Sequence, residues 1–276
     1  MPEEVQAVFR QFFSSAPELK SAREIGLMRE AGKIVAEAHR LCRTMAKPGT
    51  RTIEIDRAVE ALYAKHGATP LFKGYAGTNP KVPFPACTCI SLNEQVVHGI
   101  PGQREIRDGD IVKIDTACKL NGWCADAAVS IPVGTVRPER LRLIATGERV
   151  LAIAMEELTK RRWWSEIAGL MQRCAEQAGY SVVEQYVGHG IGRIMHENPQ
   201  VPNFVIKSYK ELRKTDFRLE PGLVLAIEPM VNMGSAETRV LNDQWTVVTK
   251  DGLPSVHVEH TLALTANGVI VVTADG

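Results

Sequence analysis

The stretch Ile111–Val129, which reads IVKIDTACKLNGWCADAAV, decides the fold. Two apolar runs of β-forming residues flank Asn121-Gly122, a pair that predicts a hairpin with a two-residue loop. Each arm carries one aspartate, Asp115 or Asp126. With that loop, Asp126 lies opposite Ala117, which shares a strand face with Asp115 because side chains repeat every second residue. The two carboxylates are then diagonal neighbours, about 7–8 Å apart at the backbone.

Two acids this close inside apolar strands need a compensating charge. Either a cation lies between them or one of them holds a proton, because an isolated buried carboxylate is very costly. The alternative is a hairpin whose two acids are solvated. The apolar context favours a metal site, and a metal site predicts further ligands elsewhere in the chain.

The composition is that of an ordinary soluble globular protein. The 276 residues are 45% hydrophobic and 24% charged, and a chain of this length buries roughly three-quarters of its unfolded surface. The formal net charge of +1 argues against a general polyanion-binding role, so we expect no specific nucleic-acid partner. A monomer is the default expectation.

The cysteines and the apolar runs indicate the compartment. The six cysteines form no CxxC pair and lie in apolar segments, as expected of reduced thiols in a cytoplasmic protein. No signal peptide is apparent, and no run reaches the roughly 18 apolar residues of a membrane span. We therefore expect a cytoplasmic location and no membrane partner.

Four helices are predicted after a short N-terminal extension over residues 1–20. Ser21 and Glu24 form a capping box that begins the first helix. The predicted helices cover residues 21–46, 53–66, 138–160 and 166–178. The apolar pattern of residues 55–67 returns at 167–179, an offset of 112 residues. This repeat predicts one catalytic domain over 21–276, built of two similar halves at about 21–135 and 136–276; chance similarity of two amphipathic helices is the alternative.

The remaining apolar segments predict strands. They are residues 86–93, the hairpin, 181–187, 223–233 and a meander over 239–272. Because helices and strands occur in blocks, we expect an α+β fold with a mostly antiparallel sheet. If residues 250–254 form the loop of a hairpin, Glu259 lies across from Trp245.

Two histidines follow a glycine-rich turn. In the segment Gly188-His189-Gly190-Ile191-Gly192, the glycines permit a sharp bend or a close backbone approach. His196 lies seven residues after His189, so a bend between them is needed for both to enter one cavity. One buried histidine and one surface histidine are the alternative.

Two glutamates end or interrupt apolar strands. Glu228 follows five apolar residues and precedes Pro229, and a glutamate in such a position is rarely left unpaired in a core. Glu259 lies among β-branched residues. The neighbouring His257 and His260 are interpreted as structural or solvent-facing. For Glu228, a solvated strand end is the alternative.

These acids and one histidine form a candidate ligand set: Asp115, Asp126, His189, Glu228 and Glu259. Four carboxylates balance two divalent cations. Oxygen-rich ligation with one imidazole suits two divalent metal ions such as Co, Mn, Fe or Zn rather than a thiolate zinc site. Paired metals about 3.5–4 Å apart are a common arrangement for activating water in hydrolases.

At this point the motif series resembles the type I methionine aminopeptidases. The matching motifs, in order, are VHGIP at 97–101, the Asp115/Asp126 pair, GHGIG at 188–192 with His196-Glu197, IEPM at 227–230 and VEHT at 258–261. The match extends from about Ala22 to Thr265. The resemblance implies the pita-bread fold, in which two pseudo-symmetric halves surround a di-metal centre.

The resemblance also implies a role for each matching residue. Asp115 and Asp126 ligate metal, with Asp126 bridging, and His189, Glu228 and bridging Glu259 complete the ligands. Glu228 is also the catalytic base. His98 and His196 are catalytic residues that contact the substrate. The methionine side chain is bound by Cys89, Met195, Met230 and Trp245, with Phe84 and Tyr75 as less securely aligned neighbours.

The activity implied is release of the N-terminal methionine from nascent chains and peptides with a small second residue. Three features depart from the usual pattern of the family: Met195 where Phe is common, a longer segment over residues 76–83, and an expanded basic segment over 206–219. The basic segment is interpreted as a solvated loop, with a transient ribosome contact as the alternative. Residues 161–164, Arg-Arg-Trp-Trp, have no functional interpretation.

Two other functions compete with methionine removal. Related pita-bread peptidases that cleave Xaa-Pro bonds use the same five ligands, but the VHGIP and GHGIG motifs favour methionine removal. A non-catalytic relative that binds nascent chains or ribosomes is expected to lack ligands, and here none is missing.

Overall fold

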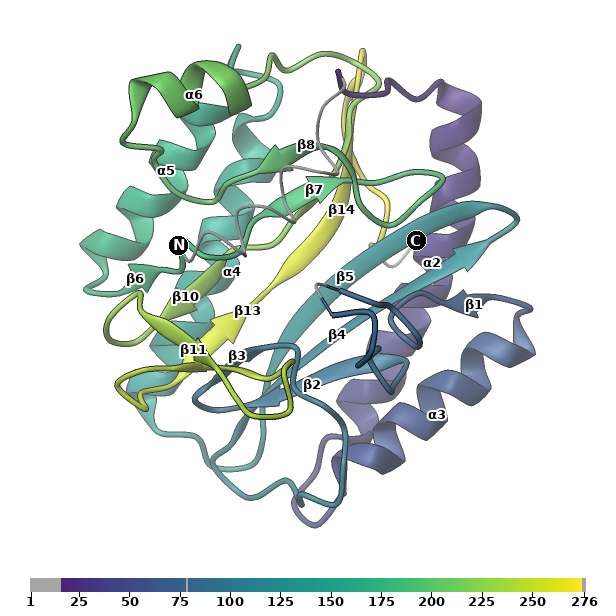
Figure 1. Ribbon diagram of the computed structural model, residues 1–276, viewed down its shortest axis with the longest axis vertical. Helices are drawn as coiled ribbons and strands as arrows, with labels where there is room; N and C mark the ends of the chain where they lie inside the picture. Colours follow the sequence, from purple (N-terminus) through teal and green to yellow (C-terminus); the bar gives the residue numbers. More distant parts are fainter. Residues whose placement is uncertain (1–15, 78, 275–276) are drawn as a thin grey trace.

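The computed structural model describes residues 16–77 and 79–274. Most of the predicted N-terminal extension, residues 1–15, lies outside the described residues. Among the residues described, no helix is both long and apolar enough to cross a membrane. The elements form one large sheet, two small sheets and a layer of helices (Figure 1).

The opening hairpin has the predicted register. Strands β4 (Ile111–Leu120) and β5 (Trp123–Pro132) pair antiparallel, and Ala117 lies opposite Asp126. Asn121 and Gly122 have φ angles of 49° and 84°, the left-handed backbone that a two-residue hairpin loop requires. An even loop keeps Asp115 and Asp126 on one face of the sheet.

The large sheet has nine strands and is antiparallel throughout, which confirms the predicted α+β class. Its path runs β1-β4-β5-β14-β9-β7-β8, with β2 beside β4 and β15 beside β14. Besides the hairpin, its strands are β1 (Thr69–Pro70), β2 (Thr88–Leu92), β7 (Gly188–Gly190), β8 (Glu197–Val201), β9 (Val224–Ile227), β14 (Glu259–Thr265) and β15 (Gly268–Val271). Strand β14 joins β5 of the first half of the chain to β9 of the second.

The predicted meander over residues 239–272 is wrong, because these strands separate into three sheets. β11 (Thr238–Val240) and β12 (Val247–Thr249) pair with each other and with β3 (Gln95–Val97). β13 (Ser255–His257) pairs instead with β10 (Met230–Asn232), which also pairs with β6 (Ser181–Val182). Consequently Glu259 lies opposite Ala128 and not opposite Trp245. Sequence-distant strands bury these apolar faces better than neighbours in the chain do.

Four long helices begin and end close to the predicted residues. They are α2 (Ala22–Met45), α3 (Thr52–Lys65), α4 (Pro138–Glu157) and α5 (Trp164–Gln177); a fifth, α6 (Tyr209–Thr215), is short. The predicted capping box of Ser21 and Glu24 begins α2. α3 and α5 both have 14 residues, and α5 begins 112 residues after α3, as the repeat predicts. This agreement supports two similar halves.

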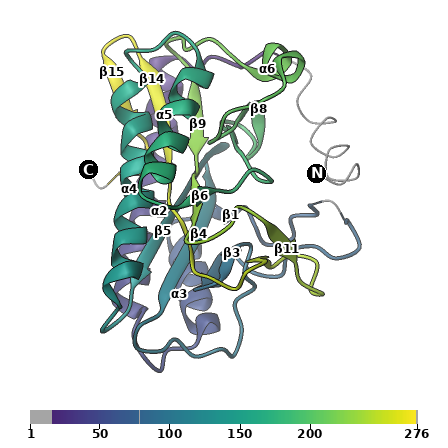
Figure 2. The same ribbon diagram turned by 90° about the vertical axis from the view of Figure 1, so that its left-hand side faces the viewer.

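Long helices cover one side of the large sheet. Figure 2 shows α2, α4 and α5 together on that side, with β3 and β11 on the other. One buried apolar cluster joins α2 and α3 to the hairpin, and a second joins α4 and α5 to β9 and β14. With one face sealed by helices, any site for a ligand is left to the other face.

Candidate metal centre and substrate pocket

The five predicted ligands lie in one cavity of about 270 Å³ on the side of the sheet away from the helices. Asp115 on β4 and Glu259 on β14 both lie opposite Ala128 of β5. Asp126 lies two residues before Ala128 on β5, and its side chain is on the same face of the sheet. The antiparallel register therefore places three acids of three strands side by side.

Glu228 and His189 complete the group from the second half of the chain. Glu228 follows β9 directly, and Ile227, the last residue of β9, pairs with His260 next to Glu259. His189 on β7 lies opposite Ala226 of β9, and its Nε2 is 3.7 Å from Oε1 of Glu228. Asp126, His189 and Glu259 each offer a donor atom within 4.8 Å of the others.

The acids of this cavity are buried without protein partners. Among the described residues, Oδ1 of Asp115, Oδ1 of Asp126 and Oε1 of Glu259 are buried and accept no hydrogen bond. Burial raises the pKa of each carboxyl well above its usual range, and the neighbouring carboxylates raise the pKa of Asp115 and Glu259 further. Four acids with this crowding and these free lone pairs fit divalent cations, which would replace the protons.

Three hydrogen bonds position His189 and Asp126. Nδ1 of His189 lies 2.9 Å from the carbonyl of Gly190, which can only accept, so Nδ1 carries the proton and Nε2 keeps its lone pair toward the acids. Burial lowers the pKa of His189 to about 4, which keeps the ring neutral. The hydroxyl of Thr261 donates to the carbonyl of Asp126 and accepts from its N–H, and these bonds hold β5 against β14.

The two histidines proposed to contact substrate line the same cavity from separate loops. His196 packs edge-on against His189, with ring centroids 4.4 Å apart, so the chain does bend between them. Its Nδ1 lies 2.9 Å from the hydroxyl of Tyr75. His98 follows β3 with φ of 57° and packs against Tyr186 and Trp245. Burial lowers the pKa of His98 to about 4 and holds the pKa of His196 well below its usual value.

An apolar wall borders the carboxylates. Cys89 and Met195 belong to a buried cluster with Phe72 and Phe84, and Trp245 packs on Phe84 at 5.2 Å between ring centroids. Met230 lines the cavity from a different cluster, together with the valines of β3 and β12. The cavity therefore joins a polar end, where the acids lie, to an apolar end.

The loop that carries Met195 and His196 is tied down by a buried ion pair. Nζ of Lys20 lies 2.7 Å from Oε2 of Glu197, while Oε1 of Glu197 accepts the N–H groups of Arg193 and Ile194. The lysine side chain is only 1% exposed. The end of the predicted extension thus packs beneath the site.

Sequence analysis missed one residue of the site, because His257 was interpreted as structural or solvent-facing. His257 is 2% exposed, and its Nε2 lies 3.6 Å from Oε2 of Glu228 and 4.0 Å from Oε2 of Glu259. The available signal was the alternation of His257 and Glu259 on one strand face. His260, by contrast, faces away and contacts the hydroxyl of Thr273.

Residues 161–164, which have no functional interpretation, meet the basic segment over residues 206–219 on the surface. The backbones of Trp163 and Arg218 form an antiparallel bridge, and Trp164 donates to the carbonyl of Phe217. Part of the expected solvated loop over residues 206–219 is the helix α6. Trp163 and Tyr209 are exposed beside the basic side chains.

Comparison with known proteins assigns the family. Residues 26–266 match the model of metallopeptidase family M24. Methionine aminopeptidase 1 of Bacillus subtilis is 44% identical over 254 residues, which cover 92% of this chain and 98% of that protein. Methionine aminopeptidase of Clostridium perfringens is 46% identical over 255 residues, with the same coverage.

Solved structures agree on the fold. The crystal structure of methionine aminopeptidase from Thermotoga maritima has a TM-score of 0.85 at 35% identity and covers 94% of this chain and 100% of that one. A prolidase from Pyrococcus horikoshii has a TM-score of 0.71 at 21% identity, with 94% of this chain and 64% of that chain covered, and shows the shared fold only. The predicted pita-bread fold is confirmed. The chain therefore belongs to metallopeptidase family M24.

Proposed function

We propose that this protein is a methionine aminopeptidase, which hydrolyses the first peptide bond of nascent chains and peptides and prefers a small second residue. The observation that supports this most is the joining, in one cavity, of five ligand-type side chains to an apolar slot. The names of the similar proteins from Bacillus and Clostridium point the same way.

The carboxylate end would hold two divalent ions, of Co, Mn, Fe or Zn. Asp115, Asp126, His189, Glu228 and Glu259 would be the ligands. When bound, such ions polarise the scissile carbonyl and lower the pKa of a coordinated water. The protein itself provides a buried, rigid frame, because every ligand except Glu228 lies within a strand of the large sheet.

Glu228 transfers the proton. Its carboxylate lies beside His189 and His257, so it is close to the reacting end of the cavity. It takes a proton from water and passes it to the leaving nitrogen, as a positioned carboxylate can. Pro229 keeps this residue extended at the end of β9.

His196 and His98 orient the substrate as neutral donors. The hydroxyl of Tyr75 lies 2.9 Å from Nδ1 of His196, and we assign it as the donor of that bond. This leaves the Nε2–H of His196 to donate to the oxygen on which negative charge develops. His98, held between Tyr186 and Trp245, hydrogen-bonds the amide on the leaving side.

Specificity for methionine comes from Cys89, Met195, Met230 and Trp245. Soft, polarisable thioether and thiol groups suit the thioether of the substrate, and the indole supplies a flat wall. Trp245 is fixed by a 2.9 Å bond from Nε1 to the carbonyl of Val82. Val82, in the segment expected to be longer than usual, therefore supports the slot.

The test compares Met-Ala-Ser with a peptide that has a Xaa-Pro bond. Protein from which metal has been removed with a chelator is assayed alone and after addition of Mn, Co, Fe or Zn. We expect cleavage of Met-Ala-Ser only, and only with metal. Cleavage of the Xaa-Pro peptide alone would make the protein a prolidase-type relative, and cleavage of neither with any metal would favour a binding protein.

The proposal includes a cytoplasmic location and a transient ribosome contact. Arg162, Lys210, Lys214 and Arg218 are exposed and make no ion pair among the described residues, and exposed Trp163 and Tyr209 could stack on RNA bases. Co-sedimentation with ribosomes should weaken in Lys210→Glu/Lys214→Glu, while Met-Ala-Ser cleavage stays unchanged. Equal co-sedimentation of variant and wild type would exclude this surface.

A further inference from the structure

Lys113 is a buried lysine that the proposed reaction does not use. It lies on β4 between apolar residues, is 1% exposed, and shares a strand face with Asp115 two residues later. Its Nζ donates to the carbonyls of Asn93 at 2.7 Å and Ser255 at 2.9 Å. No carboxylate among the described residues lies within 4.0 Å of Nζ, so main-chain carbonyls, rather than an ion pair, hold this ammonium.

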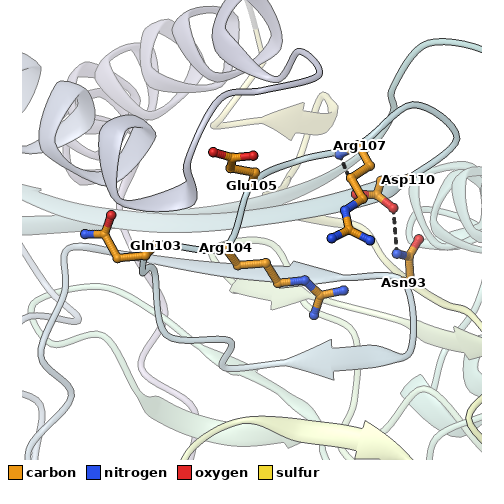
Figure 3. Close-up of a pocket in the computed structure, with 6 residues that line it drawn as sticks. All are labelled: Asn93, Gln103, Arg104, Glu105, Arg107 and Asp110. Atoms are coloured by element: carbon orange, nitrogen blue, oxygen red, sulfur yellow. Dashed lines mark hydrogen bonds between the residues drawn. The ribbon is translucent and has the colours of Figure 1, made fainter.

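The Asn93 carbonyl belongs to a rigid turn between β2 and β3. Asn93 has φ of 48°, and its side-chain amide donates to Asp110 at 2.8 Å (Figure 3). Its side-chain oxygen accepts the N–H of Ile111 and a guanidinium N–H of Arg140. Figure 3 shows Asn93 and Asp110 at one end of a polar cavity that Arg104 and Arg107 also line. The turn is thus anchored to both halves of the chain.

The Ser255 carbonyl belongs to the first residue of β13. Ser255 N–H donates to the carbonyl of Asn93 at 3.0 Å, and its hydroxyl donates to the carbonyl of Val231. The ammonium therefore links the turn after β2 to the beginning of β13. Because three donors on one nitrogen can engage several acceptors, a lysine fills this position better than a neutral side chain.

Each linked segment leads into the site within a few residues. Lys113 precedes Asp115, β3 ends directly before His98, and β13 ends at His257 before Glu259. Ser130, the cross-strand partner of Lys113, donates to the carbonyl of His257 and accepts its N–H. Three segments that carry site residues thus converge on this ammonium.

We propose that Lys113 is a positioning residue, whose ammonium fixes the relative positions of the segments that carry Asp115, His98 and Glu259. A misplacement of about 1 Å can lower a rate by about 10²-fold. Burial lowers the pKa of Lys113 to about 7, and the buried amino group is tolerated because it donates hydrogen bonds to both carbonyls. Its replacement by a side chain without donors removes the link while leaving every proposed ligand in the chain.

The test uses Lys113→Met and Lys113→Ala in the full-length protein with bound metal. This inference rests on the proposed function, so wild-type cleavage of Met-Ala-Ser is established first. We expect kcat to fall by about 10²-fold in Lys113→Met. In Lys113→Ala, we expect methylammonium, which replaces the missing ammonium, to restore kcat saturably, whereas tetramethylammonium at equal ionic strength does not, because it has no N–H.

A variant of the core serves as a control, because it shows whether lower stability by itself reduces kcat. Val59 is fully buried on α3 in the cluster beneath the hairpin, so Val59→Ala should lower Tm while keeping kcat. Thermal melting of Lys113→Ala gives a second measurement, in which methylammonium should raise Tm more than tetramethylammonium does. This readout needs no activity, so it separates failure of this inference from failure of the proposed function. Lys113→Met with kcat within twofold of wild type, or equal effects of the two ammonium ions, would overturn the inference.

Discussion

Asp56 and the acids of the metal centre are equally buried but differ in their partners. Asp56 on α3 is 5% exposed, and its Oδ1 accepts bonds from the N–H groups of Cys87 and Thr88 and from the hydroxyl of Thr88. Asp126 and Glu259 are 4% and 2% exposed, and each keeps one buried oxygen without a partner. Burial of an acid is thus no sign of function by itself. Buried carboxylate oxygens that lie close together without hydrogen-bond partners are a sign of function.

Substitution of Asp56 and of an acid of the metal centre should have different effects on activity. Glu228→Gln keeps the shape of the side chain but removes the group that takes the proton, so kcat for Met-Ala-Ser should fall by about 10³-fold. Asp56→Asn should keep kcat within a few-fold, since Asp56 lies outside the cavity. Steady-state kinetics with saturating metal measures both. Activity of Glu228→Gln within a few-fold of wild type would refute the role given to Glu228.

The second prediction concerns stability without metal. Asp56→Asn should lower the free energy of unfolding by about 2 kcal/mol, because the bonds that Oδ1 accepts from Cys87 and Thr88 are no longer made to a charged group. Asp126→Asn should change it by no more than about 1 kcal/mol, since loss of a carboxylate relieves the crowding that raises the pKa of Asp115 and Glu259.

Urea unfolding with a chelator measures these values. Added metal should then stabilise wild type and Asp56→Asn, and it should stabilise Asp126→Asn much less, because only the folded state binds it. If Asp56→Asn and Asp126→Asn lose equal stability in the presence of chelator, Asp126 has a structural role like that of Asp56.

The smallest effect concerns a buried polar atom outside the site. Nε2 of His39 on α2 has no hydrogen-bond partner among the described residues, and burial lowers the pKa of His39 from 6.5 to about 3. The unfolded chain binds a proton as pH falls below 6.5, but the folded protein stays neutral there. Stability is therefore lost as pH falls from 6.5 toward 3.

We expect His39→Gln to lose less stability over this range. The difference in slope should approach about 1.4 kcal/mol per pH unit well below pH 6.5. Unfolding free energies between pH 6.5 and 5 measure it. Parallel slopes for the variant and wild type would show that His39 is protonated in the folded protein.

The hairpin and the helices could be predicted from sequence because local rules determine them. Asn121-Gly122 specifies a two-residue loop, and the alternation of side chains then places Asp115 and Asp126 on one face. The capping box and the glycines after α3 and α5 mark helix ends. His257 and Lys113 were missed, although each is a charged or titratable residue inside an apolar run.

The pairing of distant strands could not be predicted in the same way. Glu259 lies opposite Ala128 and not opposite Trp245, because β14 pairs with β5 and β9 and not with β12. Such a choice depends on the whole core and not on the spacing of neighbouring residues.

The amino-acid sequence by itself determined the hairpin, the helix ends and the five ligand-type residues, since periodicity and turn chemistry act over a few positions. Only the tertiary structure decided that these five share a cavity, that Asp56 does not belong to it, and that Lys113 lies where three segments meet. Those facts depend on which buried polar atoms find partners, and partners come from parts of the chain far apart in sequence.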